Sequence, residues 1–256
     1  MAKGLAFLYG LIAYAIFFVT FLYAVAFVGN VIVPKTIDSG ATTPIADAIL
    51  VDVLLLGLFA VQHSVMARPG FKHWWTHFVP APVERSTYVL LTSLCLILMY
   101  WQWRPLTNVV WDVHNPAGRT LLQALFWLGW LIVLASTFMI DHFDLFGLRQ
   151  VYFYLRGREY VAVGFKAPLL YKYCRHPLLL GFLIAFWAAP HMTTGHAMFA
   201  AVTTAYILLA IQLEEHDLIV AHGERYQEYR GRTSMLLPMM QKSKPAPGSA
   251  TGSAGR

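Results

Sequence analysis

The chain of 256 residues is 58% hydrophobic and 12% charged, and its formal net charge is +6. Soluble domains carry about 25% charged residues, so the composition excludes an ordinary water-soluble protein and predicts an integral membrane protein. The excess of Lys and Arg lies mainly in loops between apolar stretches, which is typical of topology determinants. We therefore expect a lipid bilayer as the surroundings and no nucleic-acid partner.

Four stretches of the chain are apolar enough to be single membrane crossings, each of which needs about 20 apolar residues. These windows are residues 5–33, 45–66, 86–103 and 120–140. The second window is the weakest, because Asp47, Asp52 and His63 interrupt it. The sequence predicts four spanning helices here.

A fifth apolar stretch, residues 177–213, has no Asp, Glu, Lys or Arg over 37 residues. Pro190 and Gly195 bound a turn in its middle, so it predicts a hairpin of two short or tilted helices. The expected fold is an all-α membrane protein with five to six transmembrane helices, the last two forming a short helical hairpin. Residues 1–240 are expected to form a single domain, and the Ser-, Gly-, Ala- and Pro-rich residues 241–256 a disordered tail.

Basic residues alternate between many and few from one loop to the next. Lys3 and the loops 68–85 and 149–175 are rich in Lys and Arg, as is the segment after residue 213. The intervening loops carry few, among them Lys35. Because cytoplasmic loops are enriched in Lys and Arg, both termini and the long basic loops are predicted to be cytoplasmic.

Charged residues border the last apolar stretch on both sides. Arg175-His176-Pro177 precedes it, and Pro at the first position of a helix leaves free backbone N–H groups that suit a carboxylate. Glu214-Glu215 ends it, where the helix dipole favours cations instead. Adjacent helical side chains point about 100° apart, so at least one Glu is expected to face the bundle and to meet a cationic ligand or an Arg. An ordinary interfacial helix start is the alternative.

Two further polar groups lie near the predicted cytoplasmic side. His63 belongs to a Gln-His-Ser run in the second span, and it either bonds a neighbouring helix or lines a substrate site. Arg225, Tyr226, Tyr229 and Arg230 make an amphipathic patch that suits the membrane surface. No Cys or His spacing resembles a zinc site, so no metal is expected.

The ordered pair formed by Tyr171-x3-Arg175-His176-Pro177-x3-Gly181 and Glu214-Glu215-x2-Leu218-x4-Gly223-x2-Tyr226-x2-Tyr229 resembles the integral membrane methyltransferases. That superfamily includes the isoprenylcysteine carboxyl methyltransferases and the phospholipid N-methyltransferases. Segments 62–69, 84–88, 148–151, 154–158 and 164–165 are similar to the bacterial methanethiol S-methyltransferases. With these segments, the resemblance extends over most of the chain.

The resemblance implies transfer of a methyl group from S-adenosyl-L-methionine to methanethiol, giving dimethyl sulfide, in a bacterial cytoplasmic membrane. The residues expected around the cofactor, with the neighbouring charges included, are Val163, Gly164, Phe165, Lys166, Tyr171, Arg175, His176, Pro177, Leu178, Leu179, Glu214 and Glu215. His176 and His63 are the candidate bases for the thiol proton, and loss of the proton to water is equally compatible.

Two positions depart from the pattern of the wider superfamily. Leu179 stands where many relatives have Tyr, and Ala210 stands where the isoprenylcysteine enzymes have a substrate-binding Arg. The missing Arg disfavours an acceptor with a carboxylate, so a small thiol is the first expectation. A prenyl-cysteine carboxylate, an amine lipid and a non-enzymatic membrane protein of the same superfamily stay open as alternatives.

Overall fold

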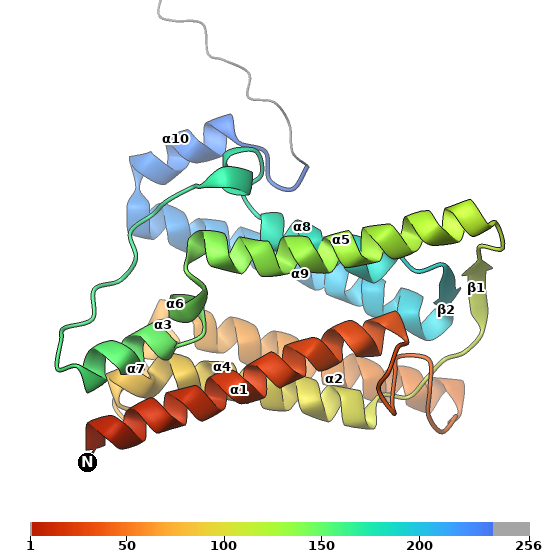
Figure 1. Cartoon of the computed structure of the whole chain (residues 1–256), viewed down its shortest axis with the longest axis horizontal. Coiled ribbons are helices and arrows are strands. Elements are labelled where there is room, and N and C mark those ends of the chain that lie inside the picture. The colour runs from red at the N-terminus through yellow and green to blue at the C-terminus, as the bar shows by residue number, and fades with distance from the viewer. Residues whose placement is uncertain (1, 238–256) are drawn as a thin grey trace, which may run out of the picture.

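The computed structural model describes residues 2–237, whose regular structure is almost entirely helical (Figure 1). The long helices are α1 Ala2–Gly29, α2 Ile45–Ala67, α4 Ala81–Gln102, α5 Pro116–Ile140 and α9 Thr194–His222. The shorter helical segments are α3 Pro69–Trp75, α6 His142–Leu145, α7 Leu148–Leu155, the 3-10 turn η1 Leu169–Lys172, α8 Pro177–Trp187 and α10 Glu224–Arg232. The predicted tail 241–256 and the predicted domain end at residue 240 lie outside the described residues.

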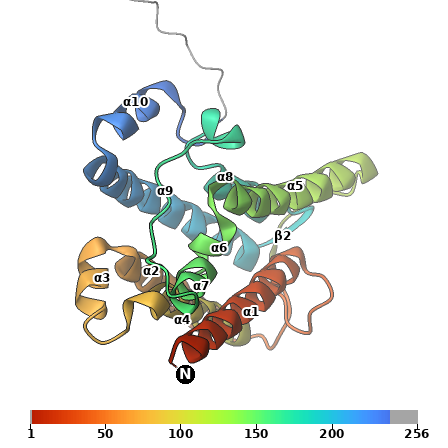
Figure 2. The ribbon, with the colours of Figure 1, turned by 60° about the vertical axis from the view of Figure 1, so that its left-hand side comes forward.

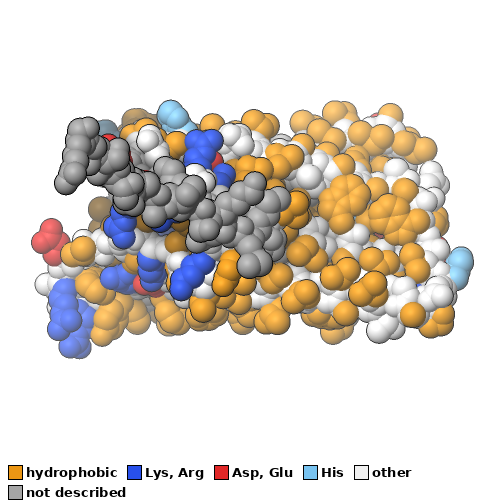
Figure 3. Space-filling model, turned by 90° about the horizontal axis from the view of Figure 1, so that it is seen from above, with side chains coloured by type: hydrophobic (Ala, Val, Ile, Leu, Met, Phe, Trp, Pro, Cys, Tyr) orange, Lys and Arg blue, Asp and Glu red, His pale blue; other side chains and the backbone are white. Residues whose placement is uncertain are grey.

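The five long helices are long and apolar enough to cross a membrane. Four of them coincide with the four predicted windows, so those spans are confirmed. Only 22% to 33% of the most apolar window of each helix is buried inside the protein. The remaining apolar side chains cover the outer surface (Figure 3), where only lipid can keep them from water. The protein is therefore a membrane protein.

Asp52 shows how the weakest predicted span tolerates an acidic residue. Its side chain is fully buried in α2, and Oδ1 accepts a hydrogen bond from the backbone N–H of Arg104 at 2.8 Å. Lys35 lies in the same region, where its Nζ donates to the carbonyl of Trp101 at 2.6 Å. Intramembrane acidic groups are normally paired in this way, so Asp52 ties α2 to the segment after α4.

The last apolar stretch forms one short and one long helix, where the sequence predicts two short or tilted helices. α8 has 11 residues and α9 has 29. At about 1.5 Å per residue, α8 is too short to cross a hydrocarbon layer about 30 Å thick. α9 is longer because its helix continues through Glu214 and Glu215 to His222.

α8 packs mainly against α5, and two glycines make the contact. A Cβ atom on Gly129 would lie 2.7 Å from the carbonyl oxygen of Gly181, and one on Gly181 would lie 2.7 Å from the carbonyl oxygen of Gly129. The two helix backbones thus touch directly, as small residues permit in membranes. This contact sets the position of α8 along α5.

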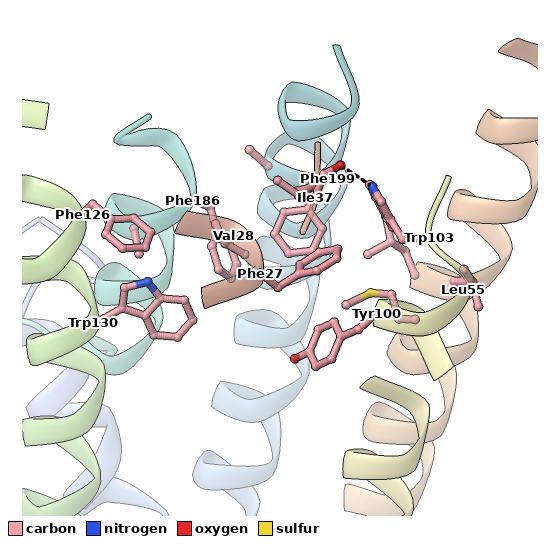
Figure 4. Close-up of a cluster of buried hydrophobic side chains, with 14 of the residues drawn as sticks. Phe27, Val28, Ile37, Leu55, Tyr100, Trp103, Phe126, Trp130, Phe186 and Phe199 are labelled. Carbon is pink, nitrogen blue, oxygen red and sulfur yellow. Dashed lines mark hydrogen bonds between the residues drawn. The ribbon is translucent and has the colours of Figure 1, made fainter. Parts of the chain in front are cut away.

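The largest cluster of buried apolar side chains joins α1, α2, α4, α5, α8 and α9 (Figure 4). Aromatic rings dominate it: Phe27 stands edge-on to Trp103, and Trp103 stands edge-on to Phe199. The indole Nε1 of Trp103 donates to the carbonyl of Ile37 at 3.0 Å, which pairs its polar atom. The cluster fastens α8 and α9 to the N-terminal helices.

The two ends of the molecule differ. At one end β1 Val109–Asp112 pairs antiparallel with β2 His191–Thr193, a small sheet that the all-α expectation did not include. The other end carries α3, α7 and α10 (Figure 1). Lys and Arg side chains gather at that second end on the face seen in Figure 3. The polar chemistry of the chain is therefore concentrated at the end opposite the sheet.

Candidate functional site

α8 begins at Pro177, directly after His176, as the sequence predicts. The backbone of His176 is non-helical, with φ −126° and ψ 60°, as the following proline favours. Its carbonyl accepts the N–H of Leu180 at 3.0 Å. The N–H groups of Leu178 and Leu179 precede that first intrahelical bond. This helix start therefore offers backbone donors and the positive end of a dipole.

Glu215 lies at the centre of a group of charges beside that helix start. Its side chain is 3% exposed, and Oε1 lies 2.6 Å from Nε of Arg175 and 3.1 Å from Nε2 of His176. Oε2 lies 3.1 Å from Nε of Arg230. A carboxylate buried to this degree requires such partners. We call Arg175, His176, Glu214, Glu215 and Arg230 the charged cluster.

The segment after α10 holds Arg175 in place from the other side. Nη1 of Arg175 donates to the carbonyl of Arg230 at 3.1 Å and to that of Thr233. The backbone N–H of Arg175 donates to the carbonyl of Ser234 at 2.9 Å. The Arg175 side chain is 9% exposed. Arg175 therefore links the start of α8 to the end of α9 and to α10.

α10 packs onto the protein through Tyr226, while the Arg230 side chain is 47% exposed; the place of this patch on the membrane surface stays a prediction. Tyr226 is 1% exposed, and burial raises its pKa to about 12. The hydroxyl of Tyr229 donates to the carbonyl of Tyr171 at 2.5 Å. Gly223, with φ 54°, turns the chain between α9 and α10. This turn carries Arg230 back to Glu215, a partner that no sequence periodicity indicated.

Glu214 differs from its neighbour in almost every respect. Its side chain is 54% exposed, and its Oε2 lies 3.7 Å from Nδ1 of His176. The expectation that at least one of the two glutamates faces the bundle is thus confirmed, and the one that does is Glu215. Because Nε2 of His176 donates to Glu215, Nδ1 is the ring nitrogen on the side of Glu214. Glu214 is the accessible carboxylate of the charged cluster.

Residues 163–166, which were expected to line a cofactor, lie against α9 and α10. The Phe165 ring is 5.2 to 5.6 Å from the rings of His222, Tyr226 and Tyr229. Of the other predicted members, Val163 is half-buried, while Gly164 and Lys166 are exposed. Tyr171 is buried and bonded to Tyr229 (Figure 2 shows the chain before α8 beside α10). The fold brings this predicted group to the same end of the molecule as the charged cluster.

His63 lies elsewhere, in a second polar group between α2, α4 and α9. The hydroxyl of Tyr88 is 2.9 Å from Nδ1 and 3.0 Å from Nε2 of His63, whose ring stacks on Phe59. Ser64 bonds the hydroxyl of Tyr206 at 3.0 Å. Within residues 2–237 no contact joins the two candidate bases. The environment of His63 matches the interhelical hydrogen bond that the sequence left as one alternative.

An ion pair beside this group was not anticipated. Nη1 of Arg68 lies 2.8 Å from Oδ2 of Asp217, and Arg68 also donates to the carbonyl of Leu213. Asp217 follows Glu214-Glu215 on α9, so α9 is held by arginines from two directions. In the sequence, the only sign of this ion pair was an Arg followed by a Pro after the end of α2. Such a pair of residues is too common to predict a partner for the Arg. Among the described residues no group of three His, Cys, Asp or Glu side chains could hold a metal ion.

Comparisons with known proteins agree on one family. The family model of the NnrU protein matches residues 51–240. The methanethiol S-methyltransferase of Mycobacterium tuberculosis is 58% identical over 93% of this chain and 98% of its own length. Methanethiol S-methyltransferase 1 of Bradyrhizobium diazoefficiens is 57% identical over 92% of this chain and 83% of its own length.

A more distant relative is the mouse protein Nurim, which is 31% identical over 65% of this chain and 66% of its own length. No solved structure matches the chain. The family model covers more than half of the chain, and the bacterial relatives are similar over nearly all of it. The chain therefore belongs to the NnrU protein family, together with these bacterial methanethiol S-methyltransferases.

Proposed function

We propose that this protein is an S-adenosyl-L-methionine-dependent methyltransferase that converts methanethiol to dimethyl sulfide. The observation that carries the proposal is the 58% identity, over 93% of this chain, to a relative named methanethiol S-methyltransferase. The charged cluster lies within the part of the chain that shares this similarity. We further propose that residues 1–240 act as one methyltransferase domain.

The residues of the charged cluster suit the charges of S-adenosylmethionine. The N–H groups of Leu178 and Leu179 suit its carboxylate, as helix starts generally do. Glu214, being accessible, suits its ammonium group or its ribose hydroxyls. Glu215 is already bonded by Arg175, His176 and Arg230. We therefore assign Glu215 a positioning role, although the sequence placed it among the cofactor contacts.

Unfilled hydrogen-bonding groups beside the charged cluster support a ligand at this place. The hydroxyls of Tyr226 and Thr233 are buried and have no partner among residues 2–237, which is costly unless a ligand or water supplies one. Phe165 and Tyr171 lie in contact with the same helix as Tyr226. Together with Val163, Gly164 and Lys166, they would form the wall that faces the rest of the cofactor.

When bound, the cofactor supplies a methyl group that its sulfonium already activates. The protein must therefore position the acceptor sulfur in line and exclude water, more than it must supply acid or base. The methanethiol sulfur forms the new S–C bond, the sulfonium S–C bond breaks, and the thiol proton is released. His176 can receive it at Nδ1, since Nε2 is engaged with Glu215. His63, already bonded to Tyr88, or water could receive it instead.

The apolar surroundings favour a small neutral acceptor. Ala210 leaves no guanidinium one turn before Glu214, so a carboxylate-bearing acceptor lacks its clamp. Methanethiol dissolves in lipid and could enter sideways between the helices, and the apolar product could leave in the same way. We propose that the charged cluster faces the cytoplasm, because the loops at that end carry most of the Lys and Arg.

The decisive experiment expresses the chain in a host that makes no dimethyl sulfide and feeds the cells methanethiol. Headspace gas chromatography should detect dimethyl sulfide only when the chain is present. Membranes supplied with S-adenosylmethionine labelled in the methyl group should transfer the label to the product. A competition between methanethiol and a prenylated cysteine analogue then decides the acceptor. Methylation of the prenyl compound alone would reject the small thiol but keep the methyltransferase.

A further inference from the structure

A cavity of about 230 Å³ lies at the sheet end of the molecule, opposite the charged cluster. Its walls come from the end of α1, the first half of α5 and the turn between α8 and β2. Val28 and Phe126, both labelled in Figure 4, belong to its apolar wall. The proposed methyl transfer makes no use of this cavity.

The polar side of the cavity follows one face of α5. Arg119, Gln123 and Trp127 line it at intervals of four residues, which places them on the same helix face. Nη1 of Arg119 bonds Asp112 and the carbonyl of Val113, at 3.1 and 3.2 Å. A guanidinium has five N–H donors, so those on Nε and Nη2 remain for another acceptor. Gln123 is exposed, and no hydrogen bond from its amide is present among residues 2–237.

His196 lines the same cavity and has an unfilled acceptor. It is 1% exposed, and its Nε2 donates to the carbonyl of Phe186 at 3.0 Å. This bond leaves Nδ1 as the lone-pair nitrogen in the neutral ring, and within the described part of the chain Nδ1 is buried without a partner. An unpaired buried acceptor costs about 1–3 kcal/mol, so a hydrogen-bond donor in the cavity would be favoured.

The residues around the cavity indicate what kind of molecule would offer both a hydrogen-bond acceptor to Arg119 and a donor to His196. Below the cavity α5 exposes Leu128 and Leu131, which are 45% and 61% exposed, so its open side continues into the lipid-facing surface. Trp127 lies eight residues further along α5 than Arg119, about 12 Å at 1.5 Å per residue, so the apolar wall extends from the polar end of the cavity into the membrane-spanning part of the helix. An occupant must therefore have apolar chains, an acceptor for Arg119 and a donor for His196.

We propose that this cavity binds the head group of one phospholipid, with its phosphate at Arg119 and Gln123. The donor of the head group, a hydroxyl or an ammonium, lies toward Nδ1 of His196. The head groups that fit this site have a phosphodiester followed by a hydrogen-bond donor. Phosphatidylglycerol and phosphatidylethanolamine have such a donor, whereas the choline of phosphatidylcholine has none. Apolar contacts with Trp127 and Leu131 hold the acyl chain.

Native mass spectrometry of the full-length protein can test this proposal. The protein is mixed with equal amounts of phosphatidylglycerol, phosphatidylethanolamine and phosphatidylcholine that have the same acyl chains. At least one donor-bearing lipid should be retained about fivefold more than phosphatidylcholine, which corresponds to one neutral hydrogen bond. Comparing retention of phosphatidylglycerol with that of phosphatidylethanolamine shows whether a hydroxyl or an ammonium is the donor. Equal retention of all three lipids would overturn the proposal.

Three variants assign the contacts. Arg119→Gln should lower retention of every lipid about tenfold, as loss of a charge-assisted hydrogen bond predicts, while the matched Arg158→Gln at the other end should leave retention unchanged. His196→Phe should abolish the preference over phosphatidylcholine. If His196→Phe does not fold, Gln123→Leu on the exposed wall replaces it and should lower total retention. Wild-type retention in Arg119→Gln would contradict the site.

Discussion

The two adjacent glutamates on α9 perform different tasks, although the sequence treats them alike. Glu215 is buried and bonded to Arg175, His176 and Arg230, while Glu214 is 54% exposed. We therefore expect truncation of Glu215 to destabilise the protein and truncation of Glu214 to weaken binding of the proposed cofactor. This difference yields a separate prediction for each residue.

Replacing Glu214 by Gln should weaken binding of S-adenosylmethionine about tenfold, because one charge-assisted hydrogen bond is lost. Thermal stability should stay the same, since Glu214 forms no hydrogen bond within residues 2–237. Isothermal titration calorimetry in detergent measures the affinity, and Glu224→Gln on α10 is the matched control. Unchanged affinity in the Glu214 variant would remove this residue from the cofactor site.

Replacing Glu215 by Ala should destabilise the protein by about 3–5 kcal/mol, because the largely buried Arg175 loses its carboxylate. Glu228→Ala is the control: Glu228 pairs with Arg232 at 3.7 Å, and both side chains are more than 60% exposed. Such a surface pair contributes about 0–1 kcal/mol. Denaturation in mixed micelles compares the two variants, and equal small effects would show that the charged cluster is not structural.

At the scale of elements, the start of α8 is positioned by backbone contact with α5. Gly129 and Gly181 allow the two helices to touch. Because backbone meets backbone there, the contact fixes where α8 lies along α5, and with it the position of His176 and of the N–H donors of Leu178 and Leu179. A perturbation of the contact tests this link between packing and the site.

Gly129→Ala should destabilise the protein by about 1–3 kcal/mol, since the new Cβ would meet backbone atoms of α8 that cannot move away cheaply. The same substitution at Gly57 is the control, because a Cβ there meets nothing within 4 Å. Alanine favours a helix by about 1 kcal/mol over glycine, so Gly57→Ala should be neutral or stabilising. Melting temperatures in the same detergent compare the two variants. A similar shift in both would reject direct α5–α8 contact.

At the scale of the whole molecule, the distribution of charge predicts the orientation in the membrane. After Leu237, a reporter that works only in the cytoplasm should be active, and one that works only outside the cell should be inactive. At Asn115 the opposite is expected. Pairs of reporters with opposite requirements, such as alkaline phosphatase and a fluorescent protein, measure this in intact cells. The reverse pattern would move the proposed cofactor site to the outer face.

Much of the architecture could be predicted from local composition. Four of the five spanning helices match windows read from the sequence, because a bilayer excludes charges and requires about 20 apolar residues wherever a helix crosses it. The start of α8 was predictable too, since Pro177 both begins a helix and restricts the residue before it. The length of α9 was not, because the charged residues that end its apolar stretch do not end the helix: Glu215 and Asp217 pair with arginines from other segments.

The membrane class, the spans, the helix start at Pro177 and the family resemblance were determined by the sequence alone, because each depends on composition or on residues close together in the chain. Only the tertiary structure decided which glutamate is buried, that Arg230 returns to Glu215, and that His63 bonds Tyr88. These pairings join residues far apart in sequence, and no periodicity encodes them. The return of Arg230 to Glu215 follows from the turn at Gly223, and the bond between His63 and Tyr88 from the packing of α2 against α4, geometry that appears only when the helices pack.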